Sequence, residues 1–509
     1  MNVSFDIIVR DGFIFDGSGN PGFKADLCVK DGKIVKIGRA VLGSADRVID
    51  AEGLVVAPGF IDIHQHSDHT LFSIPKCESF IHQGVTTVGV GNCGLSIAPL
   101  SEKYRKEIIR YYESFTFNLD VPYNWYSFDE YLCRLEELNP GVNVWPQIGH
   151  CALRATVMGY EGRAATSREL EEMKGLLKSA MEAGTPAFST GWYAPAYWAE
   201  TSELIELAKI VSKFGGIFTI HLRRAGFQEA VEVGRGADIP VEVAHYNGEG
   251  VPEARAEGLD ITYDAYPYNA SSSLLGHILP FWVYEGGVDV MLEKISDGKV
   301  RDKIRRELKD FEWNKAFIAY LPSRDSEKYV GRSVGEIAES EKADPTDVLC
   351  DILLENDGTG LYVYRNRRNE AYVLKTLRDP NQFIMSDGWG FAPYEPYNIG
   401  KPHPRCYGAF PRVLGWYVRE CEIIPLQEAI RKMTSGPALK MGIKDRGLLR
   451  EGFWADITIF NPETIIDRAT FDDPHRYPMG IEYVILNGQL VIDEGEHTGV
   501  RAGKVLRRT

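Results

Sequence analysis

The sequence alternates apolar, β-rich segments with amphipathic helical segments over most of its length. Helical stretches such as SRELEEMKGLLKSAMEAG and TSELIELAKIVSKFG lie between the apolar ones. Eight strand candidates can be counted, at residues 59–66, 84–93, 143–150, 186–190, 216–223, 240–247, 261–268 and 381–388. Eight strands with helices between them predict a parallel (β/α)8 barrel of the TIM type, a fold of the α/β class.

The two chain ends have a different character from the middle. Residues 1–57 and 440–509 contain short β-rich runs separated by Asp-Gly, Asn-Gly or Gly turns. Each end is too short to bury a core alone. We therefore expect both ends to form one small β-sandwich domain, with the barrel at residues 58–439 between them. The segment at about 280–375 is too long for one crossover, and VDVMLEKIS and VRDKIRRELKDFE predict a helical insertion near the barrel mouth.

Composition excludes several classes of protein. The 509 residues carry a net charge of −15, which disfavours nucleic acid as a partner. No run of about 18 apolar residues occurs, so no membrane span is expected. The first residues lack the features of a signal peptide, and the eight cysteines form no CxxC pair. We expect a cytoplasmic enzyme with reduced cysteines; whether it forms a homo-oligomer stays open.

Histidines cluster where the predicted strands end. The chain has only 11 histidines, and five of them close strand candidates: His64, His66, His150, His221 and His245. Each has an alternative interpretation as a hydrogen-bonded core residue. Active sites of such barrels lie at the carboxyl ends of the strands, and His64 and His66 are spaced to point to one side of their strand. The joint pattern therefore indicates a zinc site.

Two further strand ends carry reactive side chains. Cys93 lies in a Gly-Asn-Cys-Gly turn after the second strand, where it is either a buried small hydrophobic residue or an accessible thiolate. Asp387 follows the eighth strand and is either a helix cap or a general base. A metal ion beside a carboxylate predicts hydrolysis, because the metal activates water and the carboxylate moves its proton.

Longer motifs carry a resemblance to a known family. PGFIDIHQHSD, GNCGLSIAPL, FSTGWYAPAYWA, YDAYPYNASS, HPRCYGAFPRVLG and IRKMTSGPALKMGIKDRG resemble segments of the N-acyl-D-amino-acid deacylases (D-aminoacylases) of the amidohydrolase superfamily. The resemblance covers nearly the whole chain. Many two-metal amidohydrolases use a strand-four lysine to bridge the metals, whereas these deacylases use a strand-two cysteine. Here strand four, PAFSTG, has no lysine, and Cys93 stands in the cysteine position.

The resemblance implies a role for each metal-site residue. Cys93, His221 and His245 would form a tight zinc site. His64 and His66, sharing Cys93, would form a second, weaker metal position.

The resemblance also implies catalytic and substrate-binding roles. Asp387 would act as general base and then as acid, and Tyr193 would help to polarise the scissile carbonyl. Tyr266 and Ser272 would contact substrate. His150 and Arg154 match a GHxxLR motif with a site-supporting role, although Arg154 has an alternative interpretation as a charge on a helix surface.

One position departs from the family pattern. The family commonly has His-x-Lys after strand six, whereas this chain has His245-Tyr246-Asn247. A neutral amide cannot balance a substrate carboxylate. Either another cation does so, or the substrate lacks an α-carboxylate. Arg223 is our first choice for that cation, and the other candidates are Arg224, Lys401 and Arg405.

The sequence as a whole predicts zinc-dependent hydrolysis of the N-acyl bond of a small molecule, first of all an N-acyl-D-amino acid. Three alternatives stay open at this point. The protein could be a cyclic-amide hydrolase of the dihydroorotase or hydantoinase type, an amidase for substrates without an α-carboxylate, or a non-enzymatic scaffold on the same fold.

Overall fold

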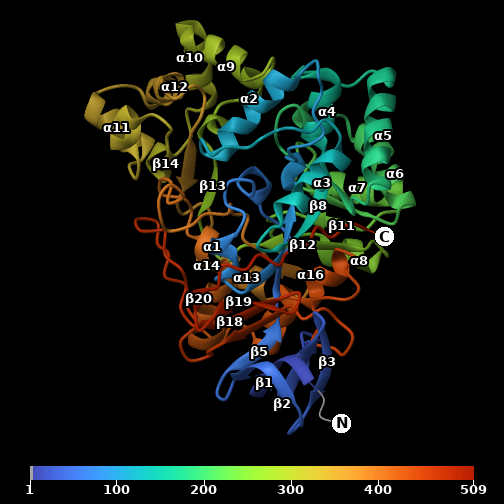
Figure 1. Ribbon diagram of the computed structural model, residues 1–509. Helices are drawn as coiled ribbons and strands as arrows, with labels where there is room; N and C mark the ends of the chain where they lie inside the picture. The colour runs from blue at the N-terminus through green and yellow to red at the C-terminus, as the bar shows by residue number, and fades with distance from the viewer. Residues whose placement is uncertain (1–3, 509) are drawn as a thin grey trace.

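The structure is a computed structural model that describes residues 4–508 (Figure 1). Its centre is a parallel eight-stranded sheet in which the strands follow one another in sequence order, except that the insertion separates the last two. The strands are β6 (Phe60–Asp62), β7 (Val85–Val90), β8 (Asn143–Gly149), β9 (Ala187–Thr190), β10 (Ile217–Ile220), β11 (Val241–Val243), β12 (Ile261–Ala265) and β16 (Gln382–Ile384). Each falls inside a predicted segment, and the predicted barrel is confirmed.

The first and last strands meet through the loops that follow them. The backbone N–H of Asp387 donates to the carbonyl of His64 at 2.9 Å, and that of His66 donates to Gly388 at 2.7 Å. Just before them, Ser386 donates from its backbone and its hydroxyl to the carboxylate of buried Asp62. These bonds close the barrel at the carboxyl ends of β6 and β16.

Helices cover the outside of the barrel. A representative one, α5 (Ser167–Glu182), begins with a capping box between Thr166 and Glu169 and buries one apolar face that includes Met173 and Leu177. The other barrel helices are α1 (Glu78–Ile81), α2 (Arg105–Thr116), α3 (Phe128–Leu138), α4 (His150–Met158), α6 (Thr201–Lys213), α7 (Phe227–Ala237), α8 (Val251–Ala256), α14 (Arg405–Arg412), α15 (Leu426–Met433) and α16 (Ser435–Lys440). Among residues 4–508, no helix is both long and apolar enough to cross a bilayer.

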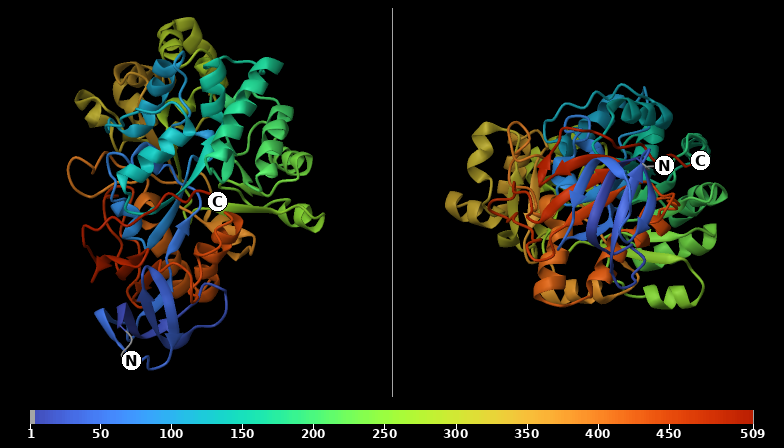
Figure 2. Two further views of the ribbon diagram at one scale, coloured as in Figure 1. Left: turned by 45° about the vertical axis from the view of Figure 1, so that its right-hand side comes forward. Right: turned by 60° about the horizontal axis from the view of Figure 1, so that its bottom comes forward.

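Both chain ends contribute to one nine-stranded sheet below the barrel. Figure 2 shows the blue and red strands side by side when the bottom of the molecule is turned forward. The link between the ends is the antiparallel pair of β5 and β17, in which Val56 faces Ile459. The strands are β1 (Ser4–Ile14), β2 (Phe23–Lys30), β3 (Lys33–Gly38), β4 (Ser44–Asp50), β5 (Val55–Pro58), β17 (Ile457–Phe460), β18 (Ile481–Leu486), β19 (Gln489–Asp493) and β20 (Glu496–His497).

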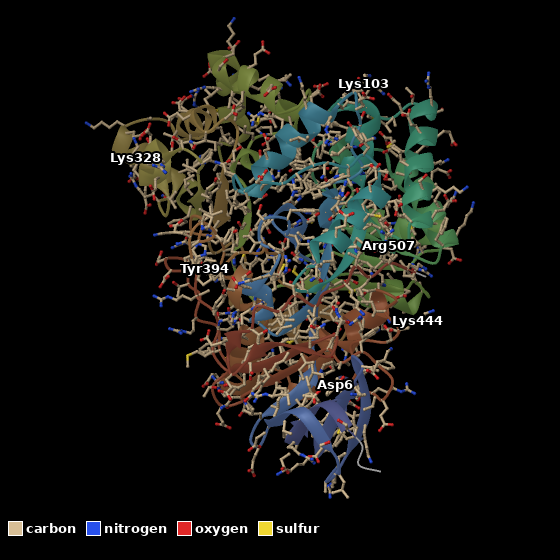
Figure 3. The ribbon with its side chains drawn as sticks, in the orientation of Figure 1. Asp6, Lys103, Lys328, Tyr394, Lys444 and Arg507 are labelled. Atoms are coloured by element: carbon tan, nitrogen blue, oxygen red, sulfur yellow. The ribbon has the colours of Figure 1, made fainter. Side chains whose placement is uncertain are left out.

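The last residues leave this sheet and pack against the barrel. Val144 of β8 donates to the carbonyl of Lys504 and accepts from the N–H of Leu506, both at 2.8 Å. Figure 3 accordingly places Arg507 beside the barrel helices, far from Asp6 of β1. The segment 440–509 is therefore not wholly part of the small domain, and boundaries at 57 and 440 stay predictions.

The insertion between β12 and β16 is not purely helical, and in this respect the expectation is wrong. It contains a three-stranded antiparallel sheet in the order β13 (Ser271–Leu274), β15 (Leu361–Tyr364), β14 (Ala316–Tyr320). Short apolar runs of this length do not distinguish a strand from a buried helical turn. Four of its helices lie at the upper left of Figure 1: α9 (Val288–Ser296), α10 (Gly298–Glu307), α11 (Val334–Glu341) and α12 (Pro345–Glu355). A fifth, α13 (Glu370–Arg378), lies nearer the centre of the molecule.

A buried polar network joins the small domain to the barrel. Asp456, just before β17, forms an ion pair with Arg446 and accepts a bond from the backbone of Asn487 at 2.7 Å. Its Oδ2, the oxygen that faces Arg446, also accepts a bond from the side chain of Asn143 on β8 at 2.9 Å. The carboxylate therefore holds three separate segments together.

We expect Asp456→Ala to destabilise the protein by about 3–5 kcal/mol, because it leaves Arg446 buried and without its counter-charge. The midpoint of thermal unfolding should fall clearly. Asp473→Ala is a matched control, because Asp473 pairs with Arg476 at the exposed surface and its loss should have little effect. Equal midpoints for the two variants would contradict a joining role for Asp456.

Candidate metal centre and active-site cavity

Cys93 lies at the mouth of the barrel among histidines from two other strands. Its Sγ is 3.3 Å from Nε2 of His64 and 3.9 Å from Nε2 of His245. The thiol belongs to a short turn after β7 in which Cys93 has a φ of 55°. This left-handed conformation is uncommon for a residue with a side chain. The three side chains form one compact group of metal-binding donors.

A second group of donors shares His64 with the first. Oδ1 of Asp387 is 3.6 Å from Nε2 of His64 and 3.3 Å from Nε2 of His66. His221, which follows β10, stacks edge-on against His245 with 4.3 Å between the ring centroids. The structure thus brings the five predicted metal-binding side chains together. A thiolate, imidazoles and a carboxylate are a donor set that suits zinc.

The charges in this site are strongly coupled. Burial raises the pKa of Cys93, but the nearby imidazoles, first of all His64, hold it well below its usual value. Burial alone would lower the pKa of His66, but Asp387 and Cys93 raise it to about 9. Burial and the neighbouring His221 lower the pKa of His245 to about 4. The site therefore favours the thiolate form of Cys93. A bound cation would stabilise this negative charge in the same way as the nearby imidazoles do.

Asp264, at the end of β12, holds two of the histidines in place. Its Oδ2 lies 3.1 Å from Nδ1 of His64, and its Oδ1 accepts the backbone N–H of His245 at 2.5 Å. Carboxylates behind metal-binding histidines orient the rings in this way. Asp264 was not among the predicted site residues, although it ends a buried strand in TYDAYPY, the same signal that the other strand ends carry.

Asp387 is held by a buried arginine. Nη1 of Arg405 is 2.8 Å from Oδ2 of Asp387, and the side chain of Arg405 is only 1% exposed. Burial raises the pKa of Asp387, but Arg405 and then His66 outweigh it and hold the pKa well below the usual range. Asp387 is therefore ionised. Arg405, considered from the sequence as a partner of the substrate, is the partner of the candidate base.

A cavity of about 580 Å³ opens above these residues. Tyr193, Tyr266 and Ser272, the predicted catalytic and substrate contacts, all line it. The ring of Tyr193 lies 5.3 Å from that of His221 and 4.6 Å from that of His277. His277 was not predicted, because it belongs to the insertion rather than to the end of a barrel strand. Further lining residues are Leu95, Phe115, Trp192, Phe281, Tyr362, Arg367, Arg368 and Trp389.

Arg223 does not line this cavity, so its predicted contact with substrate is wrong. Its guanidinium donates to Glu229 at 2.5 and 3.0 Å and to the carbonyls of Ala196 and Ala199. The chain turns after β10, and the side chain runs toward helix α7 instead of the barrel axis. Its hydrogen-bonding capacity is satisfied there.

His150 and Arg154 also lie outside the cavity. Both are fully buried on α4 and bind Glu203 of α6, with His150 Nε2 2.7 Å and Arg154 Nη1 2.6 Å from its carboxylate. His150 also meets Oγ1 of Thr190 at 2.9 Å, and the backbone N–H of His221 donates to the carbonyl of the same threonine. The pair supports the strands that carry the site and does not contact substrate, and Arg154 is not a surface charge.

A barrel closed around clustered metal donors beneath a cavity defines the class of the metal-dependent amidohydrolases. The sequence model of the amidohydrolase family matches residues 47–214 and 378–492 of this chain. The chain is 34% identical to a D-aminoacylase of Alcaligenes xylosoxydans xylosoxydans over 99% of its length and 98% of that protein. It is 32% identical to an N-acyl-D-glutamate deacylase of the same organism, over 100% and 98% of the two chains.

The solved structures agree. N-acyl-D-glutamate deacylase from Bordetella bronchiseptica, complexed with zinc and a phosphonate inhibitor, superposes with a TM-score of 0.83 at 30% identity, over 99% of this chain and 100% of that one. The chain belongs to the D-aminoacylase and N-acyl-D-amino-acid deacylase family of amidohydrolases, and the resemblance found in the sequence is confirmed. It is therefore an enzyme, a hydrolase of linear amide bonds.

We expect Cys93→Ala to lose most of its bound zinc, because the thiol touches donors of both groups. Zinc per chain, measured after mild chelation, should be about one in the wild type and close to zero in the variant. Cys151→Ala is a matched control, since Cys151 is also a buried free cysteine. Retention of zinc by Cys93→Ala would contradict the ligand assignment.

Proposed function

We propose that this enzyme hydrolyses N-acyl-D-amino acids to a carboxylate and a free D-amino acid, with zinc at the barrel mouth. The observation that carries the proposal is the position of the Cys93 thiol between His64 and His245, beneath a cavity that Asp387 also lines. Relatives over the full chain length are named for deacylation of D-amino acids. One of them has been solved with zinc.

The donors present here fit zinc. Cys93, His221 and His245 would hold the tightly bound ion, while His64 and His66 would share Cys93 in a weaker second position. The bound metal supplies a polarised carbonyl and a more acidic water. Asp264 orients the ring of His64 and holds the backbone of His245 in place.

Asp387 is the proposed general base. Arg405 binds Oδ2, so Oδ1 is left to face His66 and the reacting centre. As an ionised carboxylate it takes the proton of the attacking water. It then returns that proton to the amine nitrogen as the C–N bond breaks.

Tyr193 is the proposed donor to the carbonyl oxygen of the substrate. Burial, and then the negative charges of Cys93 and Asp387, raise the pKa of its hydroxyl well above the usual value. The hydroxyl therefore stays protonated and can donate a hydrogen bond as negative charge develops on the oxygen.

The alternatives fit the site less well. Strand β9 carries no lysine, and Cys93 stands among the ligands instead, as the resemblance implies for the open-chain deacylases rather than for cyclic-amide hydrolases. A scaffold without activity would not need an intact set of metal donors beside an ionised carboxylate. An amidase that acts on substrates without an α-carboxylate is distinguished by the substrate panel described below.

The state of the cysteines bears on the cellular location of the enzyme. The eight cysteines, all within residues 4–508, form no disulfide, which supports the cytoplasmic location expected from the sequence. The substrate is a small molecule. The oligomeric state stays open.

We expect Asp387→Asn to keep its zinc and to lose turnover of an N-acetyl-D-amino acid by about 10²–10⁴-fold, because an amide cannot move the proton. The kcat of the purified variant and its zinc content decide the matter. Asp379→Asn makes the same chemical change outside the cavity, where Asp379 accepts a bond from Tyr263, and should keep near-native turnover. Near-native kcat in Asp387→Asn would place the base elsewhere.

A further inference from the structure

Three arginines follow β15 in the insertion, and they differ in what they contact. Arg365 pairs with Asp472 at 3.2 Å and stacks over Phe317. Arg367 and Arg368 both line the active-site cavity. Within residues 4–508, no carboxylate lies within ion-pair distance of either one. The cavity wall therefore carries two positive charges that no carboxylate among residues 4–508 neutralises.

Arg368 is held firmly against the metal site. Its Nη2 donates to the carbonyl of His245 at 2.8 Å. Its guanidinium lies 5.3 Å from the ring centroid of Tyr266 and 4.3 Å from that of Tyr372. Because its orientation is already fixed, little conformational entropy is lost when the group binds a ligand.

One nitrogen of this anchored guanidinium is left without an acceptor among residues 4–508. Nη1 of Arg368 is buried and finds no partner in the part of the chain that the structure describes. A buried guanidinium donor without an acceptor is costly. An anionic oxygen in the cavity would satisfy both its charge and its N–H.

The end of strand β11 offers no charge of its own. Asn247 is neutral, and its Oδ1 accepts the backbone N–H of Glu249 at 3.0 Å, so the side chain serves its own loop. Besides Asp387, one further acid of the described chain lines the cavity. This residue, Glu312, forms an ion pair with Lys315 at 2.7 Å. The segment that carries Arg367 and Arg368 brings the positive charge to this place. Helix α13, which follows that segment, binds the loop after β11 through the hydroxyl of Tyr372, which donates to the carbonyl of Tyr246.

We propose that Arg368 binds a carboxylate on the amine half of the substrate. It would thereby determine specificity for substrates that carry this carboxylate over those in which an uncharged amide replaces it. The inference deepens the proposed function and depends on it. Two carboxylates share this chemistry: the α-carboxylate of any N-acyl amino acid and the side-chain carboxylate of an acidic one. Arg367 is exposed, donates weakly to Ser271 at 3.4 Å, and lies at the rim.

The test compares Arg368→Gln with wild type on four substrates: N-acetyl-D-alanine, its carboxamide, N-acetyl-D-glutamate and N-acetyl-D-glutamine. A charge-assisted hydrogen bond of this kind corresponds to a rise in KM of roughly 10- to 100-fold. If Arg368 binds the α-carboxylate, KM rises for all substrates except the carboxamide. If it binds the side chain, KM rises for N-acetyl-D-glutamate alone. The kcat and the zinc content should change little.

Two control variants separate a lost charge from a loosened loop. Tyr372→Phe removes the neighbouring bond between helix α13 and the loop after β11 without changing charge. Arg365→Gln removes a charge from the loop outside the cavity. Both should keep KM within about threefold of wild type. Arg368→Lys keeps the positive charge but lacks the planar guanidinium with its several donors. Its KM for the carboxylate-bearing substrates that Arg368→Gln binds poorly should therefore lie between the values of wild type and Arg368→Gln.

Several outcomes would overturn the proposal. An equal rise in KM for acids and amides, or the same selectivity loss in Tyr372→Phe, would make Arg368 a structural residue. Should Arg368→Gln fail to fold, an unchanged KM for the acid in Arg368→Lys would overturn the proposal just as well. A wild-type enzyme that hydrolyses none of the four compounds would instead contradict the proposed function itself.

Discussion

The pair of backbone hydrogen bonds that closes the barrel between its first and last strands is the constraint on which the site depends. These bonds join His64 to Asp387 and His66 to Gly388. They bring a ligand pair from one end of the barrel domain against a carboxylate that is more than three hundred residues away in the sequence. Without this closure, the group of His64, His66 and Asp387 could not form.

The backbone at the strand ends completes the arrangement. Cys93, His245 and Asp387 have positive φ values of 55°, 37° and 51°, which residues with side chains rarely adopt. Each residue lies in the turn after a parallel strand, and each contributes to the cluster at the barrel mouth. Such conformations persist where surrounding contacts determine them, and they are frequent at functional sites.

The electrostatics of the cavity centre on a single tyrosine. The ring of Tyr266 lies 4.7 Å from the guanidinium of Arg405 and 5.3 Å from that of Arg368. Arg405 holds Asp387, the proposed base, and Arg368 is the proposed partner of the substrate. An aromatic ring stabilises nearby cations through its electron-rich face, so this residue helps two positive groups to coexist in one buried wall. The sequence alone predicted Tyr266 as a contact without this reason.

Much of the fold could be predicted from the sequence, because each barrel strand is a short apolar run that ends in a polar or reactive residue. The five candidate metal ligands could be proposed for the same reason. The three-stranded sheet of the insertion could not, since LYVY and AFIAY carry no period that separates strand from helix. Arg223 was assigned wrongly because its direction depends on a turn after β10, and Arg368 was missed because nothing in RNRR indicates which arginine reaches the cavity.

The central claim is that a cysteine thiolate and histidines share a zinc ion at the barrel mouth. X-ray absorption at the zinc edge of the isolated protein tests it most directly. The account predicts one sulfur neighbour per zinc at about 2.3 Å, together with nitrogen or oxygen neighbours at about 2.0–2.1 Å. A coordination shell of nitrogen and oxygen alone would contradict it.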